Sequence, residues 1–345
     1  MTRFQTLRSL WRVAAAFALA LLAGCGQPAS HPVLRPSAHA AASTLSTADL
    51  ARFKVNELGV IPILEYHEVG AGGRWGRTVS QFRADLLRLY TEGYRPVTID
   101  EMLAGCPNLA AGASPVAITF DDARESQFRF APDGGIDPNC AIGIMQDFAR
   151  THPDFPAHAT FYVLPARAFG PPDQSARKLQ QLLALGCQIG NHTVTHPHLS
   201  RLTDAAVESE FAGCVAQLSR LAPGVRVDSV ALPYGIAPHN RALIESGSSA
   251  SVSYANRSCL LVGAGPAPSP FSRRFNAMRL PRIQTVEGPY GITFWLDILK
   301  HHPNRRFVAG GDPAVVAAPE SMRSFLNPAA LDGRVAKFYG SITGG

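Results

Sequence analysis

The sequence predicts an α/β protein whose parallel strands form a barrel-like sheet. Short apolar runs alternate along the chain with longer stretches of helical spacing, an alternation typical of parallel strands joined by crossover helices. Several of the apolar runs also end in polar residues that are capable of chemistry. Because the carboxyl ends of parallel strands meet on one face of a barrel, we expect these residues to share one site.

The composition predicts a folded protein, and we expect no nucleic-acid partner. The 345 residues are 46% hydrophobic and 17% charged, which excludes a disordered chain and fits one large domain or two small ones. The formal net charge is +6, but residues 1–24 hold three arginines and no acidic residue, so the rest of the chain carries +3. We find no motif typical of DNA- or RNA-binding proteins.

The N-terminal 24 residues are typical of a signal peptide. Three arginines precede the apolar run VAAAFALALLAG, which is too short to span a bilayer comfortably. The run ends in LLAGC, which resembles the lipobox of bacterial lipoproteins and implies cleavage before Cys25 and lipidation of its thiol. An ordinary secretory signal with an incidental cysteine is the alternative. We therefore expect an exported protein, lipid-anchored to a bacterial cell membrane on its periplasmic or cell-surface face.

The remainder divides into a tether and a single domain. Residues 25–48 are rich in Ala, Ser and Pro and are expected to be a tether, and residues 49–345 are expected to form the domain. An oxidising compartment would permit disulfides, but an odd number of cysteines leaves at least one thiol free. The absence of a CxxC pair argues against a thiolate zinc site. The five cysteines after Cys25 are Cys106, Cys140, Cys187, Cys214 and Cys259.

Ten segments are predicted to be strands or helices. The expected strands are IPILEYHEV, VAITFDD, HATFYVL, GCQIGNH, SVALPYG and MRLPRIQTV. The expected helices are SQFRADLLRLYTEG, CAIGIMQDFARTH, SARKLQQLLALG and TDAAVESEFAGCVAQLSRLA, and Thr203 is a suitable N-cap for the last of them. Residues 263–275 are rich in Pro and Gly and are expected to be a loop.

Two adjacent carboxylates follow the second apolar run. Neighbouring residues on a strand point to opposite faces, so the strand must end between Asp121 and Asp122 if both are to serve one site. One carboxylate can then bind a cation while the other stays free to act as a base. The alternative is a solvated start of a loop, with Asp122 as a cap or turn former. His67, Asn191, His192 and Tyr234 end other apolar runs.

A pair of histidines is the second candidate element of the site. On an extended strand His192 and His196 would lie about 13 Å apart. Metal–ligand bonds are roughly 2.0 to 2.1 Å long, so the segment must coil for one turn if both histidines bind one metal. Pro197 favours a stop there, and His198 is expected to lie outside the site. Two histidines and one carboxylate leave positions open for water and substrate, as a hydrolytic metal site requires.

Three motifs together resemble a known family. TFDD (119–122), HTVTH (192–196) and LPYG (232–235) resemble, in this order, the leading motifs of the polysaccharide deacetylases, carbohydrate esterase family 4. The resemblance covers about residues 60–290. It implies a distorted (β/α) barrel that binds one divalent metal, usually zinc, with cobalt or nickel as alternatives. It also implies the removal of N-acetyl groups from an envelope or extracellular polysaccharide.

The resemblance also implies roles for individual residues. By position, Asp121 matches the catalytic base, and Asp122, His192 and His196 match the metal ligands. In the third motif, Pro233 and Tyr234 match the element whose aromatic residue helps to hold the oxyanion through its backbone N–H.

Two departures from the family pattern stand beside these matches. Many members have an arginine, oriented on the base, where this chain has Ala231. No histidine matches the general acid cleanly: His239, His301 and His302 are expected to be surface residues, while His67 is a candidate for the pocket. These departures leave open a non-catalytic, glycan-binding lipoprotein. A hydrolase of small cyclic amides is a third reading, disfavoured because a tethered enzyme suits an immobile polymer.

Overall fold

The computed structural model describes residues 45–340. The expected signal peptide, nearly all of the expected tether and the candidate lipidation residue Cys25 therefore lie outside the described residues. The described part opens with helix α1, Thr47–Phe53, which begins two residues before the expected domain boundary at residue 49. Ser46 caps this helix, because its side chain accepts a hydrogen bond from the backbone N–H of Asp49.

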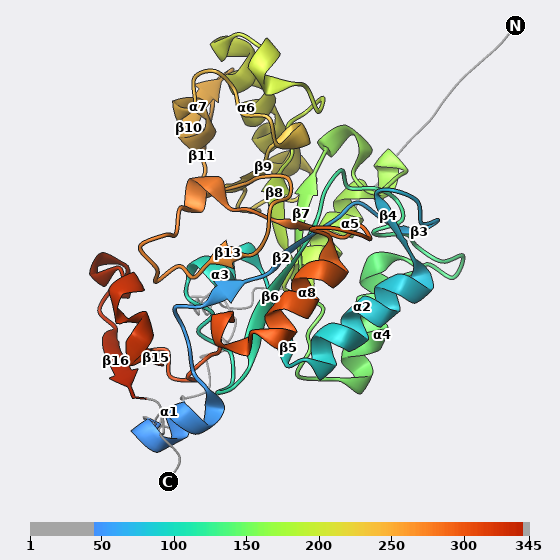
Figure 1. Cartoon of the computed structure of the whole chain (residues 1–345). Helices are drawn as coiled ribbons and strands as arrows, with labels where there is room; N and C mark the ends of the chain where they lie inside the picture. Colours follow the sequence, from blue (N-terminus) through green and yellow to red (C-terminus); the bar gives the residue numbers. More distant parts are fainter. Residues whose placement is uncertain (1–44, 341–345) are drawn as a thin grey trace, which may run out of the picture. The chain divides into compact units, whose positions relative to one another are not determined.

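The centre of the fold is a parallel sheet of eight strands, in the order β12-β9-β8-β7-β6-β2-β14, with β5 paired to the first half of β6. Leu280, shortly before β14, also pairs with Leu260 of β12, so the sheet curls until its two edges meet. This is the barrel-like α/β fold that the sequence predicts. Figure 1 labels the inner strands β2, β6, β7, β8 and β9 across the middle of the molecule. The strands are β2 Ile63–Tyr66, β5 Tyr94–Val97, β6 Ser114–Phe120, β7 Thr160–Val163, β8 Gln188–Asn191, β9 Ser229–Ala231, β12 Ser258–Leu260 and β14 Ile283–Gln284.

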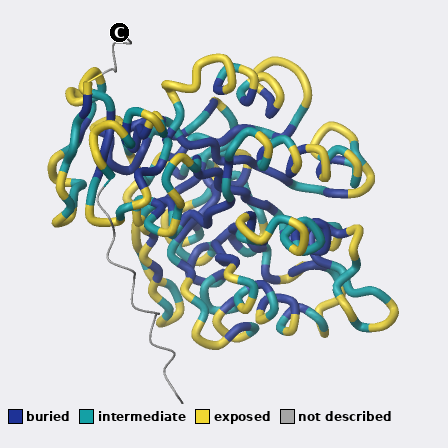
Figure 2. Tube along the Cα trace, turned by 90° about the horizontal axis from the view of Figure 1, so that it is seen from below, coloured by how far each residue is buried: buried dark blue, intermediate teal, exposed yellow. Residues whose placement is uncertain are grey.

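Helices pack on the outside of the sheet and bury its outward-facing side chains. Along β6, Val116, Ile118 and Phe120 lie in the core shared with the helices, while Ala117 belongs to a second cluster. Figure 2 shows the buried chain at the centre and the exposed chain around it. All four expected helices form, and Thr203 caps α6 as predicted. The helices after α1 are α2 Val79–Thr91, α3 Ile99–Leu103, α4 Ala141–Thr151, α5 Pro172–Ala184, α6 Asp204–Leu221, α7 Ala242–Glu245 and α8 Ile292–His301.

Four small two-stranded sheets complete the described part. Two of them matter below: β3 (Glu68–Gly70) pairs with β4 (Gly76–Thr78), and β15 (Val315–Pro319) pairs with β16 (Val335–Tyr339). The other pairs are β1 (Val60–Ile61) with β13 (Ala267–Pro268), and β10 (Ser246–Ser249) with β11 (Val252–Ala255). The expected loop 263–275 is irregular apart from β13.

One expected strand is mostly wrong. Of residues 278–286, only Ile283–Gln284 form a strand, and a 3-10 turn covers Ala277–Arg279. Pro281 has no backbone N–H to donate to a neighbouring strand, so a regular ladder cannot run through it.

The structure also bears on disulfides and on membrane spanning. Each cysteine from Cys106 to Cys259 is buried, and no disulfide joins any two of them in the described residues.

Within residues 45–340, no helix is both long enough and apolar enough to cross a membrane.

Candidate active site

The two adjacent carboxylates lie in one cavity because the chain turns sharply at them. Strand β6 ends at Phe120, one residue before the pair. Asp122 and Ala123 then adopt positive φ angles of 72° and 50°, which side-chain-bearing residues seldom do. As a result Asp121 and Asp122 both line a cavity of about 1090 Å³ at the carboxyl ends of the strands. The strand thus ends one residue earlier than the sequence analysis expects, and the two carboxylates still share one cavity.

The histidine segment coils as a shared metal would require. Thr193 and His196 have φ angles of 67° and 58°, and the Thr193 hydroxyl accepts a hydrogen bond of 3.0 Å from the His196 amide. The ring centroids of His192 and His196 lie 4.9 Å apart. Oδ1 of Asp122 lies 3.5 Å from Nε2 of His192 and 3.7 Å from Nε2 of His196. The sequence-predicted ligands therefore come together.

This triangle fits a divalent metal. Bonds of about 2.0 to 2.2 Å in a tetrahedral arrangement place ligand atoms roughly 3.3 to 3.6 Å apart, close to the observed separations. Nδ1 of His192 lies 2.9 Å from the Ala231 carbonyl and donates to it, so Nε2 is the ring nitrogen that faces Asp122 and is available to a metal. Two imidazoles and one carboxylate suit zinc and its neighbours in the first transition row.

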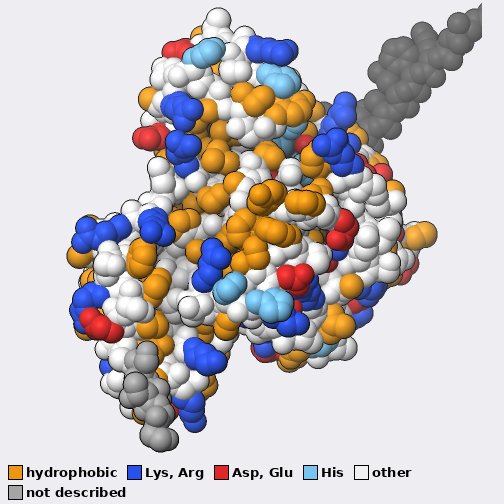
Figure 3. Space-filling view, viewed as in Figure 1, with side chains coloured by type: hydrophobic (Ala, Val, Ile, Leu, Met, Phe, Trp, Pro, Cys, Tyr) orange, Lys and Arg blue, Asp and Glu red, His pale blue; other side chains and the backbone are white. Residues whose placement is uncertain are grey.

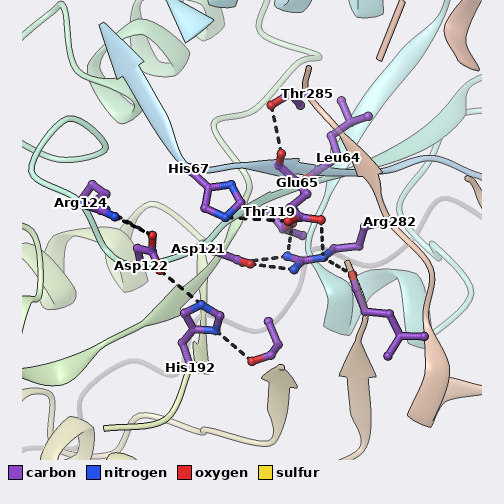
Figure 4. Close-up of polar contacts among 12 residues, drawn as sticks. Leu64, Glu65, His67, Thr119, Asp121, Asp122, Arg124, His192, Arg282 and Thr285 are labelled. Atoms are coloured by element: carbon purple, nitrogen blue, oxygen red, sulfur yellow. Dashed lines mark hydrogen bonds and ion pairs between the residues drawn. The ribbon is translucent and has the colours of Figure 1, made fainter. Parts of the chain in front are cut away.

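Arg124 fixes the orientation of the candidate metal ligand Asp122. Its Nε and Nη2 donate to Oδ2 of Asp122 at 3.2 and 3.1 Å, which leaves Oδ1 directed at the histidines (Figure 4). Burial would raise the pKa of Asp122, but its hydrogen bond to His192 and the nearby positive charges hold that pKa well below its usual range. The carboxylate is therefore ionised.

A buried arginine holds the candidate base. Nη1 and Nη2 of Arg282 each donate to one oxygen of Asp121 at 2.7 Å, and both residues are almost fully buried (Figure 4). Burial opposes ionisation of Asp121, but the Arg282 guanidinium, followed by His192, lowers its pKa below the ordinary value. The chain lacks an arginine at Ala231, and the segment leading into β14 supplies one instead. The sequence analysis does not identify Arg282. The signal for it was a charged residue inside the apolar run MRLPRIQTV, because a charge on a buried strand needs a partner.

Glu65 and His67 flank the base on the other side. Glu65 is 2% exposed, and its Oε1 lies 3.8 Å from Nε2 of His67, which lines the cavity. Burial raises the pKa of Glu65, with Arg282 acting in the opposite direction. Single ligand atoms of Glu65, His67 and Asp121 lie within 4.8 Å of one another. Because the Arg282 guanidinium already lies against both carboxylates, this second group does not suit a cation.

The third motif supplies one wall of the cavity. Tyr234 has a φ of 59° and is 54% exposed, and its ring stacks on His198 and meets His196 edge-on. Pro233 is buried and does not line the cavity. His198 does not line the cavity, as expected, but its ring stacks on Tyr234, which does.

The remaining polar candidates do not reach the cavity. Asn191 is fully buried, and its side chain donates to the Phe211 carbonyl and accepts from the Thr193 amide, so it fixes the histidine turn. His239, His301 and His302 are exposed and do not line the cavity, as the sequence predicts.

A family model matches the segment of the chain that carries most of this site. Residues 109–255 match the model described as polysaccharide deacetylase. This segment of the chain is therefore similar to the polysaccharide deacetylases. The matched segment contains the candidate base, the three candidate metal ligands and Tyr234. Glu65, His67 and Arg282 lie outside it.

Two curated relatives match part of the chain. The chain is 28% identical over 136 residues to a chitooligosaccharide deacetylase of Sinorhizobium fredii, and the match covers 39% of this chain and 54% of the relative. A chitooligosaccharide deacetylase of a Bradyrhizobium species is 28% identical over 126 residues, covering 36% of this chain and 48% of the relative. The chain thus spans about half the length of the curated relatives it matches.

Solved structures share the fold of this chain. The Streptococcus pyogenes deacetylase PplD, in complex with acetate, aligns with a TM-score of 0.51 at 20% identity, over 66% of this chain and 92% of that one. BC0361, a polysaccharide deacetylase from Bacillus cereus, aligns with a TM-score of 0.52 at 18% identity, over 69% of this chain and 68% of that one.

Proposed function

We propose that the protein is a metal-dependent hydrolase that removes N-acetyl groups from an envelope or extracellular polysaccharide. The observation that carries this proposal is one cavity that combines an ionised, buried carboxylate held by an arginine with a triangle of metal-ligating atoms. The similarity to chitooligosaccharide deacetylases supports an N-acetylated carbohydrate as the substrate.

Asp122, His192 and His196 are the residues that would hold the metal, and zinc is the proposed ion, with cobalt or nickel as alternatives. When bound, the ion would polarise the acetamide carbonyl and make a bound water more acidic. The outer contacts of these ligands, from Arg124 and the Ala231 carbonyl, orient them for that purpose.

The other residues supply the proton transfers. Asp121 accepts a proton from the attacking water, and Arg282 fixes both of its oxygens. The backbone N–H of Tyr234 donates to no acceptor within residues 45–340, and we assign it to the developing oxyanion. As the C–N bond breaks, the sugar nitrogen takes up a proton, and we assign its delivery to His67, which lines the same cavity. Acetate and a free amino sugar result.

We also propose that the protein is exported and lipid-anchored through Cys25, which lies outside the described residues. The arginines, the apolar run and the LLAGC sequence support this location. Mass spectrometry of the mature N-terminus checks it: an unmodified Cys25, or a chain that still begins at Met1, would contradict it.

Acetate release tests the catalytic proposal. The zinc- or cobalt-loaded protein is assayed on N-acetylated oligosaccharides and peptidoglycan beside Asp121→Asn, which keeps the size of the side chain and removes the base. We expect the wild type to release acetate, and the variant to fall by about 10²- to 10⁴-fold while it still binds metal.

Two outcomes would overturn it. If a folded, metal-loaded wild type releases no acetate from any polymer, a non-catalytic glycan-binding protein becomes the better account. Activity confined to small cyclic amides would instead identify the protein as a hydrolase of small cyclic amides.

A further inference from the structure

Gln127 is a buried glutamine beside the candidate active site that no step of the proposed function uses. It is 0% exposed and lies six residues after the candidate base, in the segment that leads from β6 to α4. Its Nε2 donates to the backbone carbonyl of Asp121 and to that of His67, each at 2.6 Å. One side-chain amide therefore joins the residue proposed to accept a proton to the residue proposed to deliver one.

This amide links the two strands beyond the point where their backbone hydrogen bonds end. Strands β2 and β6 pair side by side, and the last backbone bond between them runs from the Asp121 amide to the Tyr66 carbonyl at 3.0 Å. The chain of β6 then turns away at Asp122, which has a φ of 72°. No backbone N–H within residues 45–340 donates to the His67 carbonyl, and the Gln127 side chain supplies the donor instead.

The segment that carries Gln127 is held by the start of helix α4. The amides of Ala141 and Ile142, the first two residues of α4, donate to the carbonyls of Ser126 and Gln127 at 3.0 and 3.1 Å. N–H groups in the first turn of a helix have no partner within the helix, so they are available for such contacts. The Ser126 hydroxyl also accepts from the Val69 amide at 3.3 Å. A donor attached in this way holds its two acceptors at a fixed spacing.

The oxygen of the same amide supports a role in geometry over one in stability. Nε2 of Gln127 must face the two carbonyls, because two acceptors cannot form a hydrogen bond with each other. Its Oε1 is then buried and accepts no hydrogen bond from any described residue. A buried acceptor without a partner lowers stability, and a methionine of similar size would avoid that cost. Methionine would, however, offer no donor to the two carbonyls. Costs of this kind are typical of functional sites.

We infer that Gln127 is a positioning residue that sets the spacing between Asp121 and His67. Both of these side chains line the catalytic cavity, and single ligand atoms of the two lie within 4.8 Å of each other. This inference rests on the proposed function and deepens it, because the base and the proton donor must reach the same acetamide group. A displacement of about 1 Å in such an arrangement can lower the rate by about 10²-fold.

Gln127→Met tests the inference, because it keeps the size of the side chain and removes both donated hydrogen bonds. Gln188→Met is the matched control. Gln188 is 8% exposed, and its Oε1 accepts from the Asp100 amide and the Thr160 hydroxyl at 3.0 and 3.1 Å. It therefore also links separate segments, but it lies at the amino end of β8 and does not line the catalytic cavity.

Acetate release from N-acetylated oligosaccharides is measured on the full, zinc-loaded protein and both variants, and each rate is divided by the folded fraction. We expect kcat of Gln127→Met to fall by about 10- to 100-fold, because the base and the proton donor are displaced. Its KM should stay within about twofold, since no contact to the substrate is removed. Gln188→Met should lose stability and keep the kcat of the wild type.

Crystal structures of both variants separate this inference from the proposed function. We expect the His67 backbone to move away from Asp121 in Gln127→Met and to keep its place in Gln188→Met. A Gln127→Met protein with the kcat of the wild type, or with both backbones in their wild-type positions, would overturn the inference and leave the deacetylase proposal standing. A wild type that releases no acetate, together with a displaced His67 backbone in Gln127→Met, would overturn the deacetylase proposal and leave the spacing role of Gln127 standing.

Discussion

At the scale of single residues, Asp121 keeps its charge in surroundings that oppose it. Both of its oxygens accept hydrogen bonds from one planar guanidinium, a strong charge-assisted arrangement. The same Arg282 lies 3.5 Å from Glu65, so one buried cation serves two carboxylates. Burial raises the pKa of Glu65, whereas the pKa of Asp121 is lowered in spite of burial. Asp121 is therefore the carboxylate that stays ionised and can accept a proton.

Arg282→Lys should impair the base without removing the metal. Lysine keeps the charge but cannot donate to both oxygens in one plane, so Asp121 is held less well and its pKa rises. We expect kcat to fall by about 10²-fold. Because the base must be ionised, the acid limb of the pH profile of kcat/KM should move to higher pH.

Zinc affinity serves as the control for this variant, because Arg282 contacts none of the three candidate ligands. A pH profile that coincides with that of the wild type would show that Arg282 has only a structural role.

At the scale of helices and strands, the long elements were predictable and the short ones were not. An 18-residue helix such as α6 shows its periodicity and its cap in the sequence. Strand β14 has only two residues, too few to show a period, and it follows closely after a proline. The contact between Arg282 and Asp121 spans 161 residues and exists only because the sheet curls. No local pattern encodes such a contact, which is why the sequence predicted the metal ligands and missed the partner of the base.

Helix α6 supports the histidine turn, so its cap is worth testing. Glu210 on α6 accepts hydrogen bonds from the backbone N–H groups of Val194 and Thr195 at 2.8 and 2.9 Å. The Thr203 hydroxyl accepts from the Ala206 amide at the start of the same helix. Thr203→Ala should lower the free energy of unfolding by about 1 kcal/mol in urea titrations.

Thr203→Ser retains the cap and should unfold like the wild type. A Thr203→Ala protein as stable as the wild type would mean that the cap contributes nothing measurable to α6.

At the scale of the whole described domain, the two ends of residues 45–340 are tied together. Leu50 of α1 packs in one cluster with Ala317 of β15 and Tyr339 of β16. The Tyr339 hydroxyl donates to the Val55 carbonyl at 2.8 Å. Glu57 accepts from the amides of Gly310 and Ala317 at 3.0 and 2.7 Å. Basic side chains are spread over the face shown in Figure 3 and form no single stripe there.

Glu57 should make the stability of the domain depend on pH. Burial raises its pKa from 4.5 to about 7, so the folded protein holds a proton that the unfolded chain releases. The free energy of unfolding should therefore fall as the pH rises from 4.5 to about 7, by at most about 3 kcal/mol. Urea titrations at a series of pH values measure this slope.

Glu57→Gln cannot titrate and should flatten the dependence over that range. A slope that persists unchanged in the variant would assign it to other groups.

The buried thiols have a consequence for how the protein can be made. The five cysteines from Cys106 to Cys259 are buried, and no bond joins any two of them. Burial raises the pKa of Cys187, Cys214 and Cys259 to about 12, so almost no thiolate is present at neutral pH to react with oxidants. Folding of residues 45–340 requires no disulfide isomerase. A recombinant host with a reducing cytosol should yield the same covalent domain as an oxidising one, although export is proposed for the natural chain.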